Sequence, residues 1–119
     1  MADGKDYSKI RTDFVVRWTF LPGKKRKQGY RADLRYKGDE EQYWVIWPIF
    51  LTDAGMPYED SAEVPLDRPI EAAMVIIFDE SNASVHRKRI KIGTEFYMCE
   101  GSLIVAEGVV TRITGLFDD

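Results

Sequence analysis

The C-terminal run at residues 89–113 constrains the fold more than any other stretch of this 119-residue chain. It predicts two strands folded on each other at Glu100-Gly101-Ser102, because glycine and serine suit a tight turn. The second strand ends in the β-branched residues of 109–113, which favour extended backbone. Gly108 falls within that strand, where we expect it to relieve a bend. The run therefore predicts an antiparallel hairpin.

Four further segments have strand patterns. Residues 13–20 and 30–36 alternate apolar and polar side chains, as half-buried strands do, and we expect these two to pair across the loop between them. Residues 42–51 are the most apolar stretch, and Pro48 within them predicts a bulge, a bend or an edge position. Residues 70–78 fit a buried strand or a short helix, and their brevity and β-branched content favour the strand.

The connections between these segments are rich in turn residues. Residues 52–69 predict an irregular surface excursion, and residues 79–84 can cap one helical turn, but no convincing amphipathic helix is found. About six strands separated by turns indicate an all-β fold, either a small closed barrel or a sandwich. The length fits one domain, so we expect a flexible N-terminal tail over 1–12 and a single domain over 13–119.

Composition places the chain among folded soluble proteins, with 45% hydrophobic and 31% charged residues. The single cysteine, Cys99, allows no intrachain disulfide, and no apolar run has the length of a signal peptide or a membrane span. We therefore expect a cytoplasmic protein without a membrane partner. A net charge of −3 argues against polyanion binding by the whole surface but leaves room for a local basic patch.

Catalytic signals are sparse. The only histidine, His86, lies among arginine and lysine residues that should depress its pKa and favour an exposed position, so we interpret it as a surface or packing residue. One His and one Cys do not make a metal site, and the chain has neither a phosphate-binding GxxxxGK[ST] loop nor a calcium loop. We therefore expect no enzyme activity, no cofactor, no metal and no bound nucleotide.

Two basic clusters remain as candidate binding elements. They could bind phosphates, with Trp18, Tyr30 or Tyr36 stacking on bases or sugars, or they could be solvated loops that balance an acidic chain. The strand positions of most aromatic residues favour a core role for them. The first cluster is Lys24, Lys25, Arg26 and Lys27 with Arg31, and the second is Arg87, Lys88 and Arg89 with Lys91.

The C-terminal motif resembles a known family. The turn at Glu100-Gly101-Ser102 and the strand at 105–113 resemble the closing segment of the C-terminal domain, domain three, of elongation factor Tu. Residues 92–96, the Gly29-Tyr30-Arg31 motif and residues 14–22 resemble other strands of that domain in the same order, so the resemblance covers nearly the whole chain. It implies a six-stranded antiparallel β-barrel.

The resemblance also implies a role in translation, with departures that affect it. In elongation factor Tu the domain packs on the nucleotide-binding domain and helps to hold the T-stem of aminoacyl-tRNA, partly through the turn that matches Gly101 and Ser102. Here Ser102 replaces the second turn glycine, Leu103 replaces the arginine that follows it, and Ala32 replaces a proline. Losing the arginine removes a phosphate contact, and the 119 residues leave no room for a GTPase domain. Transfer RNA binding is therefore not inherited from the resemblance alone.

Three hypotheses follow. We favour a non-enzymatic module that binds a protein partner or self-associates through the exposed Leu103 or the hydrophobic hairpin edge. The alternative is a tRNA- or RNA-binding module that uses basic loops 24–31 and 87–91, which requires both loops on one face. The third is an enzyme whose pocket the sequence does not reveal. The candidate binding residues are Lys24, Lys25, Arg26, Lys27, Arg31, Arg87, Lys88, Arg89, Gly101, Ser102 and Leu103.

Overall fold

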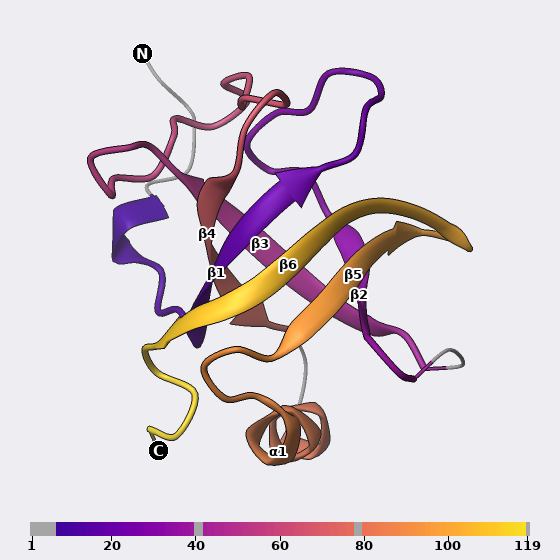
Figure 1. Cartoon of the computed structure of the whole chain (residues 1–119). Coiled ribbons are helices and arrows are strands. Elements are labelled where there is room, and N and C mark those ends of the chain that lie inside the picture. The colour runs from indigo at the N-terminus through magenta and orange to yellow at the C-terminus, as the bar shows by residue number, and fades with distance from the viewer. Residues whose placement is uncertain (1–6, 40–41, 78–79, 119) are drawn as a thin grey trace.

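The computed structural model describes residues 7–39, 42–77 and 80–118. Within them, six strands form a closed antiparallel barrel in the order β1-β4-β3-β2-β5-β6 (Figure 1). This confirms the predicted all-β, six-stranded antiparallel barrel. The strands are β1 (Phe14–Phe20), β2 (Ala32–Tyr36), β3 (Trp44–Leu51), β4 (Ile70–Ile76), β5 (Glu95–Glu100) and β6 (Leu103–Ile113); a 3-10 turn, η1 (Tyr7–Lys9), precedes them, and one helix, α1 (Glu80–Arg89), joins β4 to β5.

The expected pairing of the first two strands is wrong. β1 pairs with β4 on one side and with β6 on the other, and β2 lies between β3 and β5. The connection between β1 and β2 is too long to fix a hairpin register. Its backbone bonds instead to the connection before β4, through Gln28 N to Ala62 O at 2.8 Å and Val64 N to Arg26 O at 3.0 Å. The loop therefore crosses the end of the barrel.

The C-terminal hairpin is confirmed. β5 and β6 pair antiparallel, with Glu100 opposite Leu103 at the turn. Gly101 adopts a positive φ of 60° there, which glycine tolerates best. However, β5 also pairs with β2 and β6 with β1, so barrel closure removes the hydrophobic hairpin edge that the sequence suggested as a docking site.

Gly108 also meets a packing requirement that the sequence pattern did not predict. The strand register continues through it, with Trp18 opposite on β1 and Phe96 opposite on β5, and the register shifts lie elsewhere. A Cβ atom at position 108 would lie 2.2 Å from Cζ of Phe96. Glycine is therefore required because the Phe96 ring occupies the space of a side chain.

Two further segments agree with the sequence patterns. Residues 70–76 form β4, so the strand interpretation is confirmed; residue 78 lies outside the described residues. Pro48 lies opposite Met74 of β4, whereas β2 pairs with β3 only at residues 44–46. Pro48 thus occupies a locally open edge, where a missing backbone donor costs no ladder bond.

The barrel interior is filled with aromatic and aliphatic side chains. Trp18 is fully buried and Tyr36 is 2% exposed, so neither is placed to stack on a base, which corrects that expectation. Trp18 makes an edge contact with Phe50, with ring centroids 5.1 Å apart. The inward residues of β1 and β2 are those that the alternation predicts.

The helix α1 was not expected. The sequence predicts at most one turn followed by a basic loop, but residues 80–89 form a helix at one end of the barrel (Figure 1). Its sequence has no apolar stripe, and His86 is the residue that its described part buries. Arg87 Nε donates to Leu116 O at 2.8 Å, and Arg89 forms an ion pair with Asp39 at 3.0 Å. No helix in the described part is long and apolar enough to cross a membrane.

His86 is buried, not exposed as expected. Its exposed fraction is 0%, and its Nδ1 atom lies 2.5 Å from the hydroxyl oxygen of Tyr36. Burial, and to a lesser extent the charge of Arg89, lowers the pKa of His86 to about 4. The packing interpretation of this histidine is therefore the correct one.

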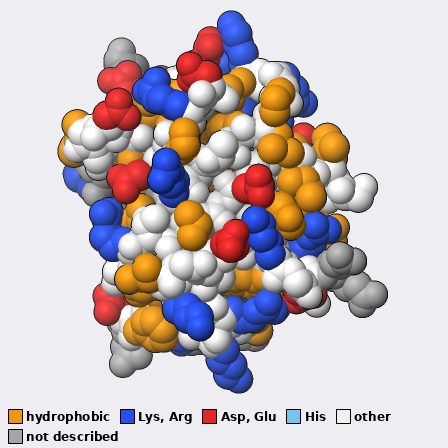
Figure 2. Space-filling model, in the orientation of Figure 1, with side chains coloured by type: hydrophobic (Ala, Val, Ile, Leu, Met, Phe, Trp, Pro, Cys, Tyr) orange, Lys and Arg blue, Asp and Glu red, His pale blue; other side chains and the backbone are white. Residues whose placement is uncertain are grey.

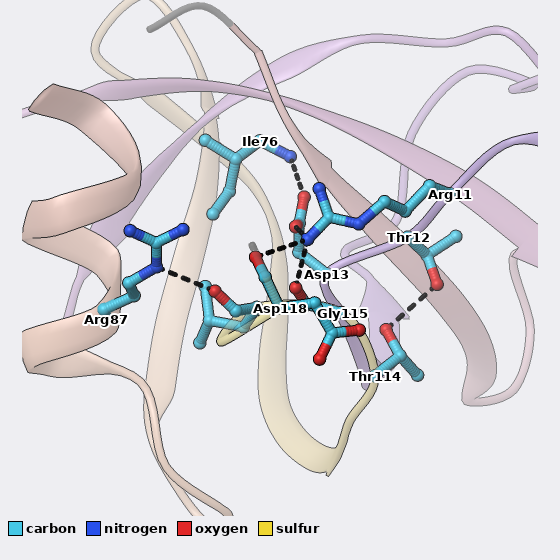
Figure 3. A network of polar contacts seen from close by, with 9 residues as sticks. Arg11, Thr12, Asp13, Ile76, Arg87, Thr114, Gly115 and Asp118 are labelled. Atoms are coloured by element: carbon cyan, nitrogen blue, oxygen red, sulfur yellow. Dashed lines mark hydrogen bonds and ion pairs between the residues drawn. The ribbon is translucent and has the colours of Figure 1, made fainter. Parts of the chain in front are cut away.

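The two ends of the described chain are joined beside α1 (Figure 3). The guanidinium of Arg11 donates to the carbonyl oxygens of Gly115 and Asp118, the second at 3.2 Å. Asp13 Oδ2 accepts from Ile76 N at 2.8 Å, which ties the start of β1 to the end of β4. Ordered structure therefore begins before residue 13, the boundary predicted for a flexible tail.

The segment before β1 also covers part of the outer barrel surface. Tyr7 is 5% exposed and packs in a second apolar cluster with Val15, Ile49, Leu51 and Ala73, outside the main core. Its hydroxyl donates to Asp60 Oδ1 at 2.5 Å. Residues 1–6 of the predicted tail lie outside the described residues.

Candidate functional site

The predicted binding residues fall into two groups at opposite ends of β2. Residues 24–31 lie against the β5–β6 turn, because Arg26 forms an ion pair with Glu100 at 3.3 Å. Residues 87–89 lie on α1, which contacts the far end of β2 through His86 and Tyr36. A five-residue strand spans about 13 Å. The two basic clusters therefore lie at opposite ends of β2 and are not adjacent.

We call the first of these regions the loop end, meaning residues 21–30 with the turn at 100–103. Arg26 is its centre and is only 8% exposed. The Arg26 guanidinium donates to Lys24 O at 2.5 Å and lies over the rings of Phe20 and Tyr30, with its Cζ atom 5.7 and 5.1 Å from the ring centroids. Arg26 thus closes one end of the barrel and is not available to bind a phosphate.

The charge of the loop end is largely balanced. Lys25 Nζ lies 3.7 Å from Glu63 Oε1, and Arg26 is already paired with Glu100. A surface hollow of about 510 Å³ at this end is lined by the residues 24–27 but also by Asp60 and Glu100. Since carboxylates lie beside these cations, the run of four positive charges does not make a strongly positive surface.

The turn at the loop end carries one exposed apolar side chain. Leu103 is 64% exposed, and its turn is braced because the hydroxyl of Tyr30 donates to Glu100 Oε2 at 2.5 Å. Leu21 is 38% exposed and its backbone nitrogen bonds to Val105 O, on the same strand as Leu103. Gly101 and Ser102 are exposed beside them. Single exposed leucines are common on protein surfaces, so this spot does not define a site by itself.

A second region has a more distinctive composition. The outward side chains of β3, β2 and β5 form rows across the sheet, and the strand register pairs Asp33 with Val45 and Arg35 with Tyr97. We call this surface the aromatic–arginine face. Its residues are Arg31, Asp33, Arg35, Tyr43, Val45, Trp47 and Tyr97.

The arginines of this face are stacked on its rings. The Cζ atom of Arg31 lies 5.2 Å from the Trp47 ring centroid. That of Arg35 lies between two tyrosines, 6.0 Å from the Tyr43 centroid and 5.2 Å from the Tyr97 centroid. A cation–π contact restricts the arginine side chain without using its N–H donors in a hydrogen bond.

The face is neither core nor fully solvated. Val45 is 41% exposed, Arg31 is exposed, and Arg35, Tyr43 and Trp47 are half-buried. In the described part of the chain neither arginine forms an ion pair with a carboxylate. The face therefore presents two oriented guanidinium groups around an apolar side chain, which suits contact with another molecule.

Of the predicted site residues, only Arg31 belongs to this face. The strand pattern predicts a core role for most tryptophans and tyrosines, and neither Val45 nor Trp47 stands out in it. The available signal was the unbroken apolar run over 42–51, because a strand without alternation is covered on both faces. Tyr7 covers part of the outer side, with its ring 5.8 Å from that of Trp47. The outer side of β3 beyond the Tyr7 contact belongs to the aromatic–arginine face.

Side-chain chemistry elsewhere is limited. No group of three His, Cys, Asp or Glu residues in the described ranges could hold a metal ion. Cys99 is free and buried, and burial raises the pKa of its thiol. His86 is enclosed between α1 and the barrel, so it cannot contact a substrate in this conformation.

Comparison with known proteins adds no relative: no family model matches this chain, and no curated protein matches it. The resemblance to domain three of elongation factor Tu therefore stays a prediction from the sequence motifs.

Proposed function

We propose that this barrel is a non-enzymatic protein-binding module that docks its partner through the aromatic–arginine face. The observation that carries the proposal is the gathering of Trp47, Tyr43, Tyr97 and two stacked arginines on one outer sheet surface. Tryptophan, tyrosine and arginine are the residues most enriched among interface hot spots, and the two aromatic side chains contribute a large contact area at a small entropy cost. The partner is another protein or a second copy of this chain.

The charge of the surrounding surface supports a protein partner over RNA. Lys37 Nζ bonds to Glu95 at 3.0 Å and to Glu107 at 3.1 Å, so this cation is already neutralised. Asp33 lies between Arg31 and Arg35 along β2. An RNA backbone would therefore meet little net positive charge, although electrostatic attraction supplies most of non-specific RNA affinity.

RNA binding remains a second candidate for one reason. The rings of Tyr43, Trp47 and Tyr97 are half-buried on the outer side of the sheet, and bases stack on aromatic rings that a sheet presents in this way. A titration of labelled tRNA at low and at physiological salt tests this candidate. Saturable binding that weakens steeply with salt and is lost in Arg31→Gln would favour RNA; no binding at low salt would remove it.

Two observations support the non-enzymatic part of the proposal. The only histidine is enclosed under α1, and the only cysteine is buried with a raised pKa, so neither is poised for acid–base or nucleophilic chemistry. A free cysteine also fits a reducing compartment, and we place the module in the cytoplasm on that ground.

Site-specific photo-crosslinking in cells tests the docking surface. A benzoylphenylalanine is introduced in place of Val45 on the aromatic–arginine face, of Leu103 at the loop end, or of Thr19 on the outer side of β1, which is exposed and serves as the control. We expect a discrete crosslinked product at position 45 that disappears when Arg31→Ala is added. The same product at position 19 would show non-specific capture, and a product confined to position 103 would move the docking surface to the loop end.

Sedimentation velocity separates the two kinds of partner. A concentration-dependent dimer that Val45→Glu abolishes would identify a second copy of the chain as the occupant, because a charge at the centre of an apolar contact is costly to bury. A monomer at all concentrations would assign the position-45 product to a different protein.

A further inference from the structure

We propose that the aromatic–arginine face recognises an extended acidic segment of its partner, with two carboxylates four residues apart and an apolar residue midway. This inference rests on the proposed protein-binding function and names the chemistry of the partner. It is carried by the spacing of Arg31 and Arg35, by their stacking, and by what lies between them.

The spacing comes from the strand geometry. Arg31 immediately precedes β2 and Arg35 lies within it, so four residues separate two side chains on the outer face. Four residues of extended backbone span about 13 Å, and alternate side chains point to the same side. An extended peptide has the same repeat, so its residues i and i+4 can face both arginines at once.

The stacking prepares both arginines for carboxylates. Each guanidinium lies against a ring of the face, Arg31 on Trp47 and Arg35 between Tyr43 and Tyr97. A guanidinium held in one plane offers a fork of donors that fits a carboxylate bidentately, and less side-chain entropy is lost on binding. Within the described residues neither group has a carboxylate partner that a ligand would have to displace.

Val45, at the centre of the aromatic–arginine face, determines which residue the ligand can have midway between its two carboxylates. Val45 is 41% exposed and stands opposite Asp33 in the strand register, between the rows of the two arginines. An apolar side chain at i+2 would bury Val45, whereas a third carboxylate there would face Asp33 and be repelled. The pattern thus disfavours a phosphate backbone, whose charges repeat at every nucleotide.

Fluorescence anisotropy with short labelled peptides tests this pattern on the full chain. The probe is Gly-Ser-Glu-Thr-Leu-Thr-Glu-Ser-Gly, with its glutamates at i and i+4. One control peptide has the same composition with the two glutamates adjacent, and another has glutamine at both positions. We expect the probe to bind about tenfold or more tightly than either control, since two charge-assisted contacts are lost or cannot form together.

Protein variants locate the binding. Arg31→Gln with Arg35→Gln should abolish probe binding, whereas Lys24→Gln with Lys27→Gln changes the net charge equally at the loop end and should leave the affinity unchanged. Arg31→Lys with Arg35→Lys keeps the charge but loses the planar fork, so we expect most of the affinity to be lost. Val45→Asp keeps both arginines and should also abolish binding. Thermal melts confirm that each variant folds.

Specific results would overturn the inference. Equal affinity for the probe and for the adjacent-glutamate peptide would show that the spacing of the two carboxylates does not matter. Equal losses of affinity in the Arg31/Arg35 and Lys24/Lys27 double variants would show that only general charge attracts the probe. Full affinity in the Arg→Lys variant would show that the planar guanidinium is not required. A crosslinked partner at position 45 without probe binding would overturn this inference and leave the proposed function standing. Neither a crosslinked product nor probe binding would overturn both.

Discussion

The loop end and the aromatic–arginine face differ in what their positive charges are bonded to. The loop end has four consecutive cations, yet Arg26 is buried against Glu100, Lys25 lies near Glu63, and carboxylates line the hollow. The aromatic–arginine face has fewer cations, but Arg31 and Arg35 meet rings instead of carboxylates. Figure 2 shows Lys and Arg side chains interspersed with acidic and hydrophobic ones over the visible surface, without one large basic field.

This difference shows that the density of charge along a sequence does not measure its availability for binding. A guanidinium that closes a barrel end already has its desolvation compensated by an internal carboxylate, so a ligand would have to break that pair. A guanidinium stacked on a ring keeps its donors for a ligand. Four experiments test this contrast, and the first concerns the barrel on which both regions depend.

Replacing Gly108 should have the largest effect, because both regions depend on an intact barrel. In Gly108→Val the new side chain would overlap the Phe96 ring, whose Cζ atom lies 2.2 Å from the position that a Cβ atom would take. We expect a loss of about 3 kcal/mol in the free energy of unfolding, measured by urea titration. In a Phe96→Ala background, where the ring is absent, Gly108→Val should cost less unfolding free energy than it does in the wild type. An unchanged unfolding midpoint for Gly108→Val alone would contradict the close packing of Gly108 against Phe96.

Lowering the pH should reduce the unfolding free energy through His86, which is buried at the end of the barrel opposite the loop end. The pKa of His86 is lowered from 6.5 to about 4 in the folded state, so its contribution to stability is complete above pH 6.5 and is lost as the pH falls toward 4. We expect this residue to account for about 2 kcal/mol between pH 7 and pH 4.5, on the order of 1.4 kcal/mol per pKa unit. Carboxylates titrate in the same window, so the measurement is the difference between the wild type and His86→Gln at each pH. A constant difference would contradict burial of the neutral imidazole.

At the loop end itself, we expect Arg26 to contribute to the stability of the fold and the neighbouring lysines to contribute little. Arg26→Met removes the partner of Glu100, which is 32% exposed, and should cost about 1.5 kcal/mol of unfolding free energy. Lys24→Met is the matched control, because Lys24 is exposed and lies in the same run. Equal melting temperatures for the two variants would place Arg26 among the solvated charges.

The smallest effect is expected for the remaining lysines of the loop end. Lys24→Gln with Lys27→Gln should change the unfolding free energy by less than about 0.5 kcal/mol, as surface substitutions usually do. It should also leave any tRNA binding and its salt dependence unchanged, since neighbouring carboxylates already balance this region. A flatter salt dependence in this variant would show that the loop end binds phosphates, and the contrast with the aromatic–arginine face would fail.

Local patterns predicted much of the fold. The alternation in residues 13–20 and 30–36 identified the inward side chains of β1 and β2, and the turn at 100–102 identified the hairpin. The strand order was not predictable in this way, because β1 pairs with β4 and β6, which are distant in the chain. The helix α1 was missed because it packs through a histidine and polar bonds and has no apolar stripe.

The candidate site was predicted less well than the fold. Arg31 was identified as a binding residue, but for a basic loop that is largely neutralised, and its ring partner Trp47 was assigned to the core. Sequence periodicity assigns a side chain to one face of a strand, yet it does not say whether a neighbouring element covers that face. Here Tyr7 covers part of the outer side of β3, whereas Val45 on the same side is 41% exposed.

The sequence by itself determined which segments become strands and which side chains point inward, because both follow from the two-residue period of an extended chain. The tertiary structure alone decided which charges remain available. Arg26 and Arg31 belong to the same basic cluster, but the fold brings Glu100 of β5 to the first and Trp47 of β3 to the second. These partners come from the two strands that flank β2, and a charge pattern read locally carries no information about them.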